Sequence, residues 1–219
     1  MKSFVSAYLH CSIGFLAFLS TTSLEAELDW QRVPIPSNVK HILIHNGAFV
    51  AFTQTGIYTS TDGEAWEALV NEDMFAIQHL IQANQQTIAF ATYRDETNNN
   101  HAAILTSTDL SNWNTQYDYP LESSASFSWS VVTPVGEGFA TDGKTSSKTI
   151  ALYSTDQINW ELTLEIDTAI NGSSSDGKGS YFMFVEDTFS DSAWRTSDGQ
   201  NWQFDNAGSK PRYFANFNG

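Results

Sequence analysis

One seven-residue phrase, written four times, constrains the fold of this chain more than any other feature. It reads STDGEAW from Ser60, STDLSNW from Ser107, STDQINW from Ser154 and TSDGQNW from Thr196. Its four aspartates are separated by 47, 47 and 42 residues. A four-stranded propeller blade takes roughly 40–50 residues. The phrase therefore predicts a repeat protein with one such unit per phrase.

The text around each phrase predicts four strands per unit. Each unit has a less regular segment, a continuous apolar run, a short apolar segment just before the phrase, and a stretch after its tryptophan. In the first unit these segments are 39–45, 48–52, 57–59 and 67–70. Continuous apolar runs of this length are typical of strands covered on both faces. No segment shows a sustained helical period with caps.

We therefore predict an all-β fold, a β-propeller of four-stranded antiparallel blades. The blades are expected at about residues 39–70, 75–117, 126–164 and 168–205.

The phrase itself fits a tight turn between the third and fourth strands. Its aspartate can accept hydrogen bonds from backbone N–H groups of the turn, and the Ser or Thr two residues earlier adds a second anchor. Gly63 and Gly199 suit a position with positive φ. Leu110 and Gln157 stand at that position in the middle copies, so we expect those turns to change conformation or to be strained.

The closing tryptophan can cover apolar surface between units while its N–H finds a partner. Because a repeat unit repeats what the fold needs, we interpret the phrase as structural and not as four active sites. The residues interpreted in this way are Ser60, Asp62, Gly63, Trp66, Ser107, Asp109, Trp113, Ser154, Asp156, Trp160, Thr196, Asp198, Gly199 and Trp202.

Ser60-Thr-Asp-Gly-Glu-Ala-Trp66 and its three relatives resemble the Asp-box, or BNR, repeats of sialidase-like β-propellers. The segment Asn46-Gly-Ala-Phe-Val-Ala51 is similar to a strand opening common in such repeats. The resemblance covers about residues 39–205. It implies boxes on the periphery of each blade, away from the central pocket where ligands of this family bind.

Sialidase enzymes of this superfamily use three arginines, a tyrosine–glutamate pair and an aspartate. Arg32-Val33-Pro34 is similar to their Arg-Ile-Pro signature, and Arg94 and Arg212 are the other candidates, because Arg195 precedes a box and is interpreted as structural. The Asp–Trp distance is four residues in every copy here, whereas five is common in sialidase-type boxes. The resemblance therefore favours a non-catalytic branch, and no catalytic residue is assigned.

The ends of the chain predict export and an incomplete propeller. Residues 1–26 have the pattern of a secretory signal, with an apolar core at 13–19, and the rival interpretation is a retained membrane anchor. The single domain is then 27–219, with partial blade strands at 28–35 and 212–219. An incomplete propeller is favoured over a small or open one.

Cys11, the only cysteine, falls within the predicted signal, so no disulfide is expected.

The charge balance excludes some partners. The chain has 25 acidic and 10 basic residues and a formal net charge of −15. Nucleic acids and anionic membranes attract basic surfaces, so we expect neither as a partner, and no stable membrane insertion once the signal is removed. The expected location is periplasmic or extracellular.

Few residues outside the repeats suggest chemistry. His41 and His45 fall on one face of a predicted innermost strand, but two histidines without a third ligand are a weak metal signal. The polar segments 95–100 and 171–180 and the acidic stretch 186–191 are interpreted as solvated loops. We predict no metal site and no cofactor.

The favoured hypothesis is an exported, non-catalytic propeller that presents loops to a protein or glycan ligand. The alternatives are a sialidase-type glycoside hydrolase and an assembly factor for a membrane complex.

Overall fold

A computed structural model describes residues 15–16, 31–32, 35–53, 56–70, 75–122, 125–185 and 192–206 of the 219-residue chain. The predicted C-terminal partial strand at 212–219 and nearly all of the predicted signal segment 1–26 lie outside these residues. The chain divides into two compact units, residues 1–73 and 74–219.

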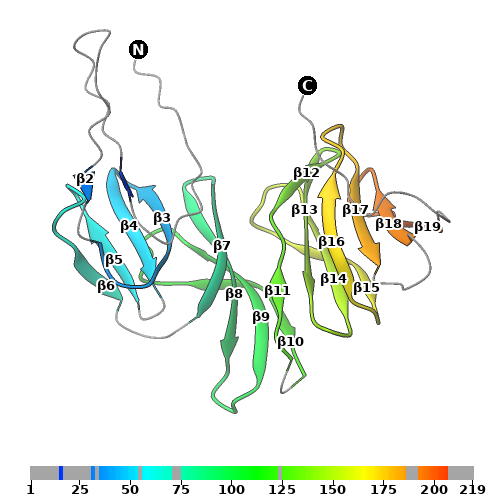
Figure 1. The fold of residues 1–219 in the computed structure, drawn as a ribbon, viewed down its shortest axis with the longest axis horizontal. Coiled ribbons are helices and arrows are strands. Elements are labelled where there is room, and N and C mark those ends of the chain that lie inside the picture. Colours follow the sequence, from blue (N-terminus) through cyan, green and yellow to red (C-terminus); the bar gives the residue numbers. More distant parts are fainter. Residues whose placement is uncertain are drawn as a thin grey trace, which may run out of the picture. The chain divides into compact units, whose positions relative to one another are not determined.

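The first unit contains one four-stranded antiparallel sheet, which we name blade 1 (Figure 1). Its strands follow one another in chain order across the sheet. They are β3 (Val39–His45), β4 (Ala48–Thr53), β5 (Ile57–Ser60) and β6 (Glu67–Val70).

The second unit contains three sheets, which we name blades 2, 3 and 4 (Figure 1). The strands of blade 2 are β7 (Ala76–Ala83), β8 (Gln86–Arg94), β9 (Asn100–Ser107) and β10 (Asn114–Pro120). Those of blade 3 are β11 (Ser128–Trp129), β12 (Thr133–Val135), β13 (Gly138–Lys144), β14 (Thr149–Ser154) and β15 (Glu161–Ile166). Those of blade 4 are β16 (Ile170–Ser175), β17 (Tyr181–Val185), β18 (Ser192–Thr196) and β19 (Gln203–Asn206).

The prediction of an all-β fold with four antiparallel blades is confirmed. In every blade the second and third strands are the more buried and the fourth is the most exposed. None of the described residues is helical, so no helix in the described ranges could span a membrane.

Blade 3 departs from the four-strand pattern in its first strand. β11 and β12 both pair with β13, through Ser128↔Lys144 at one end and Val135↔Gly138 at the other. The three residues between the two pieces, 130–132, belong to neither strand, although the Ser130 N–H still donates to β13. The first strand of this blade is therefore interrupted at its middle.

The strands β1 (Phe15–Leu16) and β2 (Gln31–Arg32) pair with each other in an antiparallel ladder. β2 falls within the partial strand predicted at 28–35, but its partner β1 lies in the predicted signal segment. Removal of residues 1–26 would therefore break this pair.

Apolar side chains fill the spaces between the three blades of the second unit. The Trp160 ring of blade 3 packs edge-on against Phe90 of β8, with 5.5 Å between ring centroids. Between blades 3 and 4, Ala151 packs with Tyr181 and Met183. Burial of such side chains is the main force that holds the blades together, since each large apolar residue contributes about 1.5–3 kcal/mol.

Candidate functional site

The four phrases form turns of one design, which we name the Asp turns (60–66, 107–113, 154–160 and 196–202). In the second of them, the Ser107 hydroxyl donates to Asp109 Oδ1 over 3.1 Å. The same oxygen accepts the backbone N–H groups of Ser111 and Asn112 at 2.9 and 2.8 Å. Equivalent bonds occur in the other three turns. Each turn aspartate thus bonds to its own loop.

All four Asp turns take the same left-handed conformation at the residue after aspartate. The φ angles are 81° at Gly63, 65° at Leu110, 66° at Gln157 and 76° at Gly199. Of the two outcomes expected for Leu110 and Gln157, the turns therefore keep their conformation and accept strain. A left-handed L-residue costs roughly 1–2 kcal/mol, and at Leu110 the burial of the side chain offsets this.

An asparagine distinguishes the later turns from the first. Asn112, Asn159 and Asn201 donate their side-chain amides to the second aspartate oxygen, at 2.8, 2.6 and 2.7 Å. The first turn has Ala65 at this place.

Hydrogen bonds lower the pKa of all four turn aspartates. The Ala65 N–H is the largest contributor at Asp62, and the Asn112 and Asn201 amides are the largest at Asp109 and Asp198. At Asp156, partial burial acts to raise the pKa, but bonds from the Asn159 and Ile158 N–H groups bring it down to about 2. The hydrogen bonds of the turns therefore stabilise the ionised form of each aspartate.

Three turn tryptophans donate their indole N–H to the turn itself. The acceptors for Trp66, Trp113 and Trp160 are the carbonyls of Gly63, Leu110 and Gln157, at 3.2, 3.1 and 2.9 Å. Trp202 instead donates to Thr163 Oγ1, on β15 of the preceding blade, over 3.1 Å.

The arginines proposed from the sialidase resemblance do not form a described site. Arg94, at the end of β8, donates to Asn100 and Asn98 in its own hairpin, at 3.0 and 3.5 Å. Arg195, on β18, donates to Gln203 over 3.2 Å. The side chain of Arg32 and all of Arg212 lie outside the described part of the chain.

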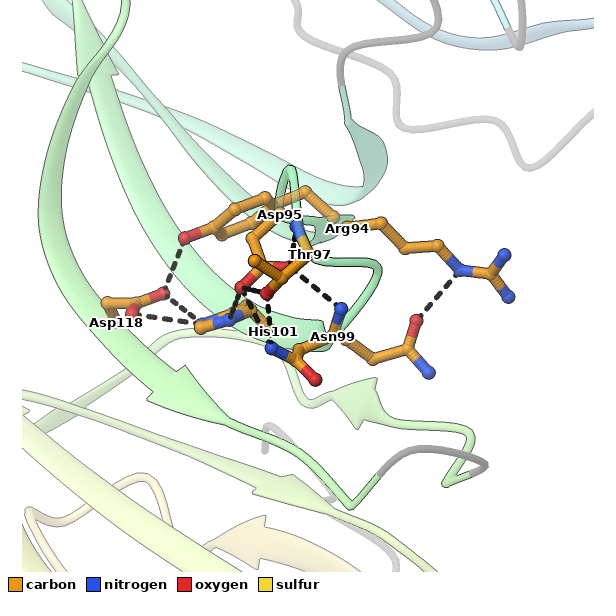
Figure 2. Close-up of polar contacts among 8 residues, drawn as sticks. Arg94, Asp95, Thr97, Asn99, His101 and Asp118 are labelled. Atoms are coloured by element: carbon orange, nitrogen blue, oxygen red, sulfur yellow. Dashed lines mark hydrogen bonds and ion pairs between the residues drawn. The ribbon is translucent and has the colours of Figure 1, made fainter.

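The polar segment at 95–100 is the turn of the β8–β9 hairpin. Asp95 Oδ1 accepts the N–H groups of Thr97 and Asn99, at 3.0 and 2.7 Å. His101 lies between two carboxylates, with Nε2 3.4 Å from Asp95 and Nδ1 3.0 Å from Asp118 (Figure 2). Because the carboxylates meet opposite ring nitrogens, they do not converge on one point where a cation would sit. The cluster ties the hairpin to β10.

The prediction of a loop over 171–180 is wrong in its first half. Residues 170–175 form β16, the first strand of blade 4, and only 176–180 form the connection to β17. Serines and glycine replace the apolar residues that would have predicted a strand, and pairing with β17 supplies the order instead. The stretch 186–191 lies outside the described residues.

His41 and His45 share the more buried face of β3 with Leu43, as predicted from the spacing. Within the described ranges, no group of three metal-binding side chains comes together.

The second unit has an open pocket of about 380 Å³ beside the first strands of its three blades. We name it the inner-strand pocket. Its lining residues come from β7, from β11, β12 and the interruption between them, and from β16 and β17. They are His79, Trp129, Ser130, Val131, Thr133, Ser173, Ser174 and Tyr181. None of these lining residues is a lysine or an arginine.

A buried carboxylate lies behind this pocket. Asp142 of β13 is 0 % exposed. Its Oδ1 accepts the Tyr181 hydroxyl at 2.5 Å and its Oδ2 accepts the Ser130 hydroxyl at 2.7 Å. Burial, followed by the charge and hydrogen bond of Asp142, raises the pKa of Tyr181 well above its usual value. The phenol therefore stays protonated, and its O–H group donates a hydrogen bond to Asp142.

Asp142 stands where the other blades have phenylalanine. Strand register aligns it with Phe52, Phe90 and Phe184, because each lies opposite the residue three before the turn Ser or Thr. The residues opposite them on the first strands are His41, His79 and Gly172. In blade 3 the partner is Ser130, whose N–H donates to the Asp142 carbonyl over 2.8 Å.

Sequence reasoning missed Asp142, Tyr181 and His79. For Asp142 the signal lies in the strand register and not in the sequence spacing: Phe52, Phe90, Asp142 and Phe184 stand at unequal distances before their turns, so only the pairing of the strands aligns them. His79 occupies the same place as His41, so an inner-strand histidine is repeated in blade 2. Tyr181 carried no signal of its own, since it begins an ordinary apolar run.

No protein-family model and no curated protein matches this chain. Among solved structures, a thermostable family-43 glycoside hydrolase is similar with a TM-score of 0.35 and 12 % identity over 74 % of this chain and 70 % of its own. The N-terminal domain of Nup159 is similar with a TM-score of 0.30 and 9 % identity, over 81 % of this chain and 65 % of its own. The fold assignment rests on the strand order and register described above.

Proposed function

We propose that this chain is an exported, non-catalytic binding protein of the Asp-box β-propeller type. It takes a polar group of a protein or glycan ligand into the inner-strand pocket. The observation that carries the proposal is the pocket itself: about 380 Å³, lined by aromatic and hydroxyl side chains from three successive blades. Ligand pockets fall in this size range and combine apolar walls with a few placed polar groups.

The turns support the assignment to the Asp-box group. Their aspartates are engaged by backbone N–H groups of their own loops, which leaves them a role in holding the blades. The absence of a catalytic role is supported by the pocket lining, which includes no arginine to hold a substrate carboxylate. In the sialidase alternative, arginines surround the substrate, whereas Arg94 is engaged in its hairpin.

The test is a ligand screen by NMR on the purified chain. Ligands that bind are then measured against two variants, one with a tryptophan in the pocket and one with a tryptophan elsewhere. Ser174→Trp fills the pocket, and Ser111→Trp puts the same bulk on an exposed turn. We expect glycan or peptide ligands found in the screen to lose at least tenfold in affinity in Ser174→Trp and to bind Ser111→Trp normally. Equal binding by both variants would contradict the pocket assignment. Release of the fluorophore from a fluorogenic sialoside would contradict the non-catalytic assignment.

A further inference from the structure

We infer that the inner-strand pocket selects a compact organic cation that carries N–H donors, such as a protonated primary amine. This inference rests on the proposed binding function and names its ligand chemistry. It follows from the acceptors to which the pocket's own hydrogen-bond donors are directed.

The strongest donors that line the pocket are directed into the protein. The Tyr181 and Ser130 hydroxyls donate to Asp142, at 2.5 and 2.7 Å. The only donor of the Trp129 indole goes to the Ala91 carbonyl over 3.0 Å. These three groups therefore have no proton left to offer a ligand.

The proton of the His79 ring is also directed into the protein. Its Nε2 lies 2.9 Å from the Trp129 carbonyl, and a carbonyl oxygen only accepts, so Nε2 carries the proton. In a neutral ring, Nδ1 is then an acceptor. The Thr133 hydroxyl also turns to a backbone carbonyl, that of Val131, at 3.3 Å.

What remains for a ligand is a set of lone pairs. The Tyr181 oxygen already accepts a hydrogen bond from the Ser173 side chain. The hydroxyl oxygens of Ser130 and Thr133 can each still accept a hydrogen bond after donating their own. A ligand that brings acceptors, such as a carboxylate or a phosphate, would face these lone pairs and be repelled. A ligand that brings N–H donors satisfies them.

The charge behind the pocket favours the same ligand. Asp142 is fully buried, and within the described ranges no lysine, arginine or histidine lies at ion-pair distance from it. Lys144, on the same strand, donates instead to the carbonyls of Ile170 and Asn171, at 2.8 and 3.3 Å. Buried carboxylates are normally offset by a cation. A cation in the pocket would be separated from Asp142 by one layer of hydroxyl groups.

The experiment compares n-butylammonium with 1-butanol, which has the same chain but no charge. Binding is followed by the shift of the Trp129 indole N–H resonance, assigned with Trp129→Phe. We expect n-butylammonium to bind at least about tenfold more tightly than 1-butanol at low salt. Binding of the alcohol or of butyrate in preference to the amine would overturn the inference.

Asp142→Asn is the direct variant, and we expect it to lose about tenfold in amine affinity. Because this substitution is buried and can impair folding, Val131 supplies a second pair. Val131 lines the pocket and is 65 % exposed, so its variants do not disturb the core. Val131→Lys should weaken amine binding about threefold or more and Val131→Glu should strengthen it, with both effects fading at high salt. Shifts of the same sign in both variants would contradict the inference.

Two further ligands separate the sources of the amine. Nα-acetyl-lysine methylamide represents a protein side chain, and its Nε-acetylated form is the uncharged control. Binding of the first and not the second would assign a lysine side chain, whereas binding of n-butylammonium alone would assign a free small amine. If a neutral glycan binds in the pocket and every amine fails, the proposed binding function stands and the present inference is wrong. If no ligand of any class binds, both fail.

Discussion

Asp156 in the third Asp turn and Asp142 in β13 belong to the same blade, yet their environments are opposite. Asp156 accepts backbone N–H groups of its own loop, and three other turns repeat the arrangement. Asp142 is fully buried, accepts hydrogen bonds from the Tyr181 and Ser130 hydroxyls, and has phenylalanine at the equivalent place in the other blades. In a repeat protein, a residue that recurs in every unit serves the unit. A polar residue that replaces an apolar one in a single unit is not explained by the repeat, and this is what the proposed binding site requires.

The largest expected effect compares the two aspartates directly. Asp142→Ala leaves the buried Tyr181 hydroxyl and the half-buried Ser130 hydroxyl without their acceptor and should cost about 3 kcal/mol in the free energy of unfolding. Asp156→Ala removes an anchor of an exposed turn and should cost about 1 kcal/mol, as capping side chains do. Urea unfolding followed by tryptophan fluorescence measures both. A larger loss for Asp156→Ala would reverse the comparison.

The second prediction asks whether the turns act on stability alone. A Cβ at Gly199 would lie 2.0 Å from the Tyr153 ring, whereas one at Gly63 would lie 3.7 Å from Phe49. Both positions have positive φ, so Gly63→Ala should cost about 1 kcal/mol and Gly199→Ala about 2–3 kcal/mol.

Thermal unfolding measures these losses, and the Trp129 indole resonance reports the pocket. We expect neither variant to move that resonance. A shift in Gly63→Ala or Gly199→Ala would show that the turns and the pocket are coupled.

The third prediction separates the two regions by pH. The folded-state pKa of Asp156 is lowered from 3.8 to about 2, so its contribution is present above pH 3.8 and is lost as pH falls toward 2. The pKa of Tyr181 is raised, so its contribution is present below pH 10 and is lost as pH rises above that value.

Unfolding free energies measured from pH 2 to 11 test this division. Asp156→Asn should reduce the acid loss by up to about 1 kcal/mol after solvent screening, without changing the alkaline side. Tyr181→Phe should reduce the alkaline loss in part, because Tyr93 and Tyr117, with pKa values raised to about 12, still contribute to it. A variant that flattened both sides would break the separation between turn and pocket.

The smallest effect has the opposite sign. Gln157 is half-buried and has a φ of 66°, so Gln157→Gly should relieve strain and stabilise the chain by about 0.5–1 kcal/mol. Leu110→Gly relieves the same strain but exposes a buried site, and should destabilise. Differential scanning calorimetry on the two variants checks the signs, and a stabilised Leu110→Gly would contradict the role given to burial.

The repeated phrase made the blades predictable, because an Asp turn and an apolar run both act within a few residues. The same local logic failed at β16, where the segment INGSSS has no apolar pattern and is a strand because β17 lies beside it. It failed at the pocket for a related reason. Asp142 and Tyr181 come from strands of two different blades and Ser130 from the interruption between β11 and β12, and nothing in the sequence states that they meet.

The interruption in the first strand of blade 3 has a consequence for association with other chains. A strand at the end of a sheet offers unpaired N–H and C=O groups to which a foreign strand can add. β3 and β7 present unbroken edges of 7 and 8 residues, whereas β11 and β12 offer 2 and 3 residues on either side of a displaced segment. Blade 3 thus has the edge least suited to intermolecular strand addition. The interruption at 130–132, which supplies two residues to the pocket lining, therefore also disfavours the addition of a foreign strand to blade 3.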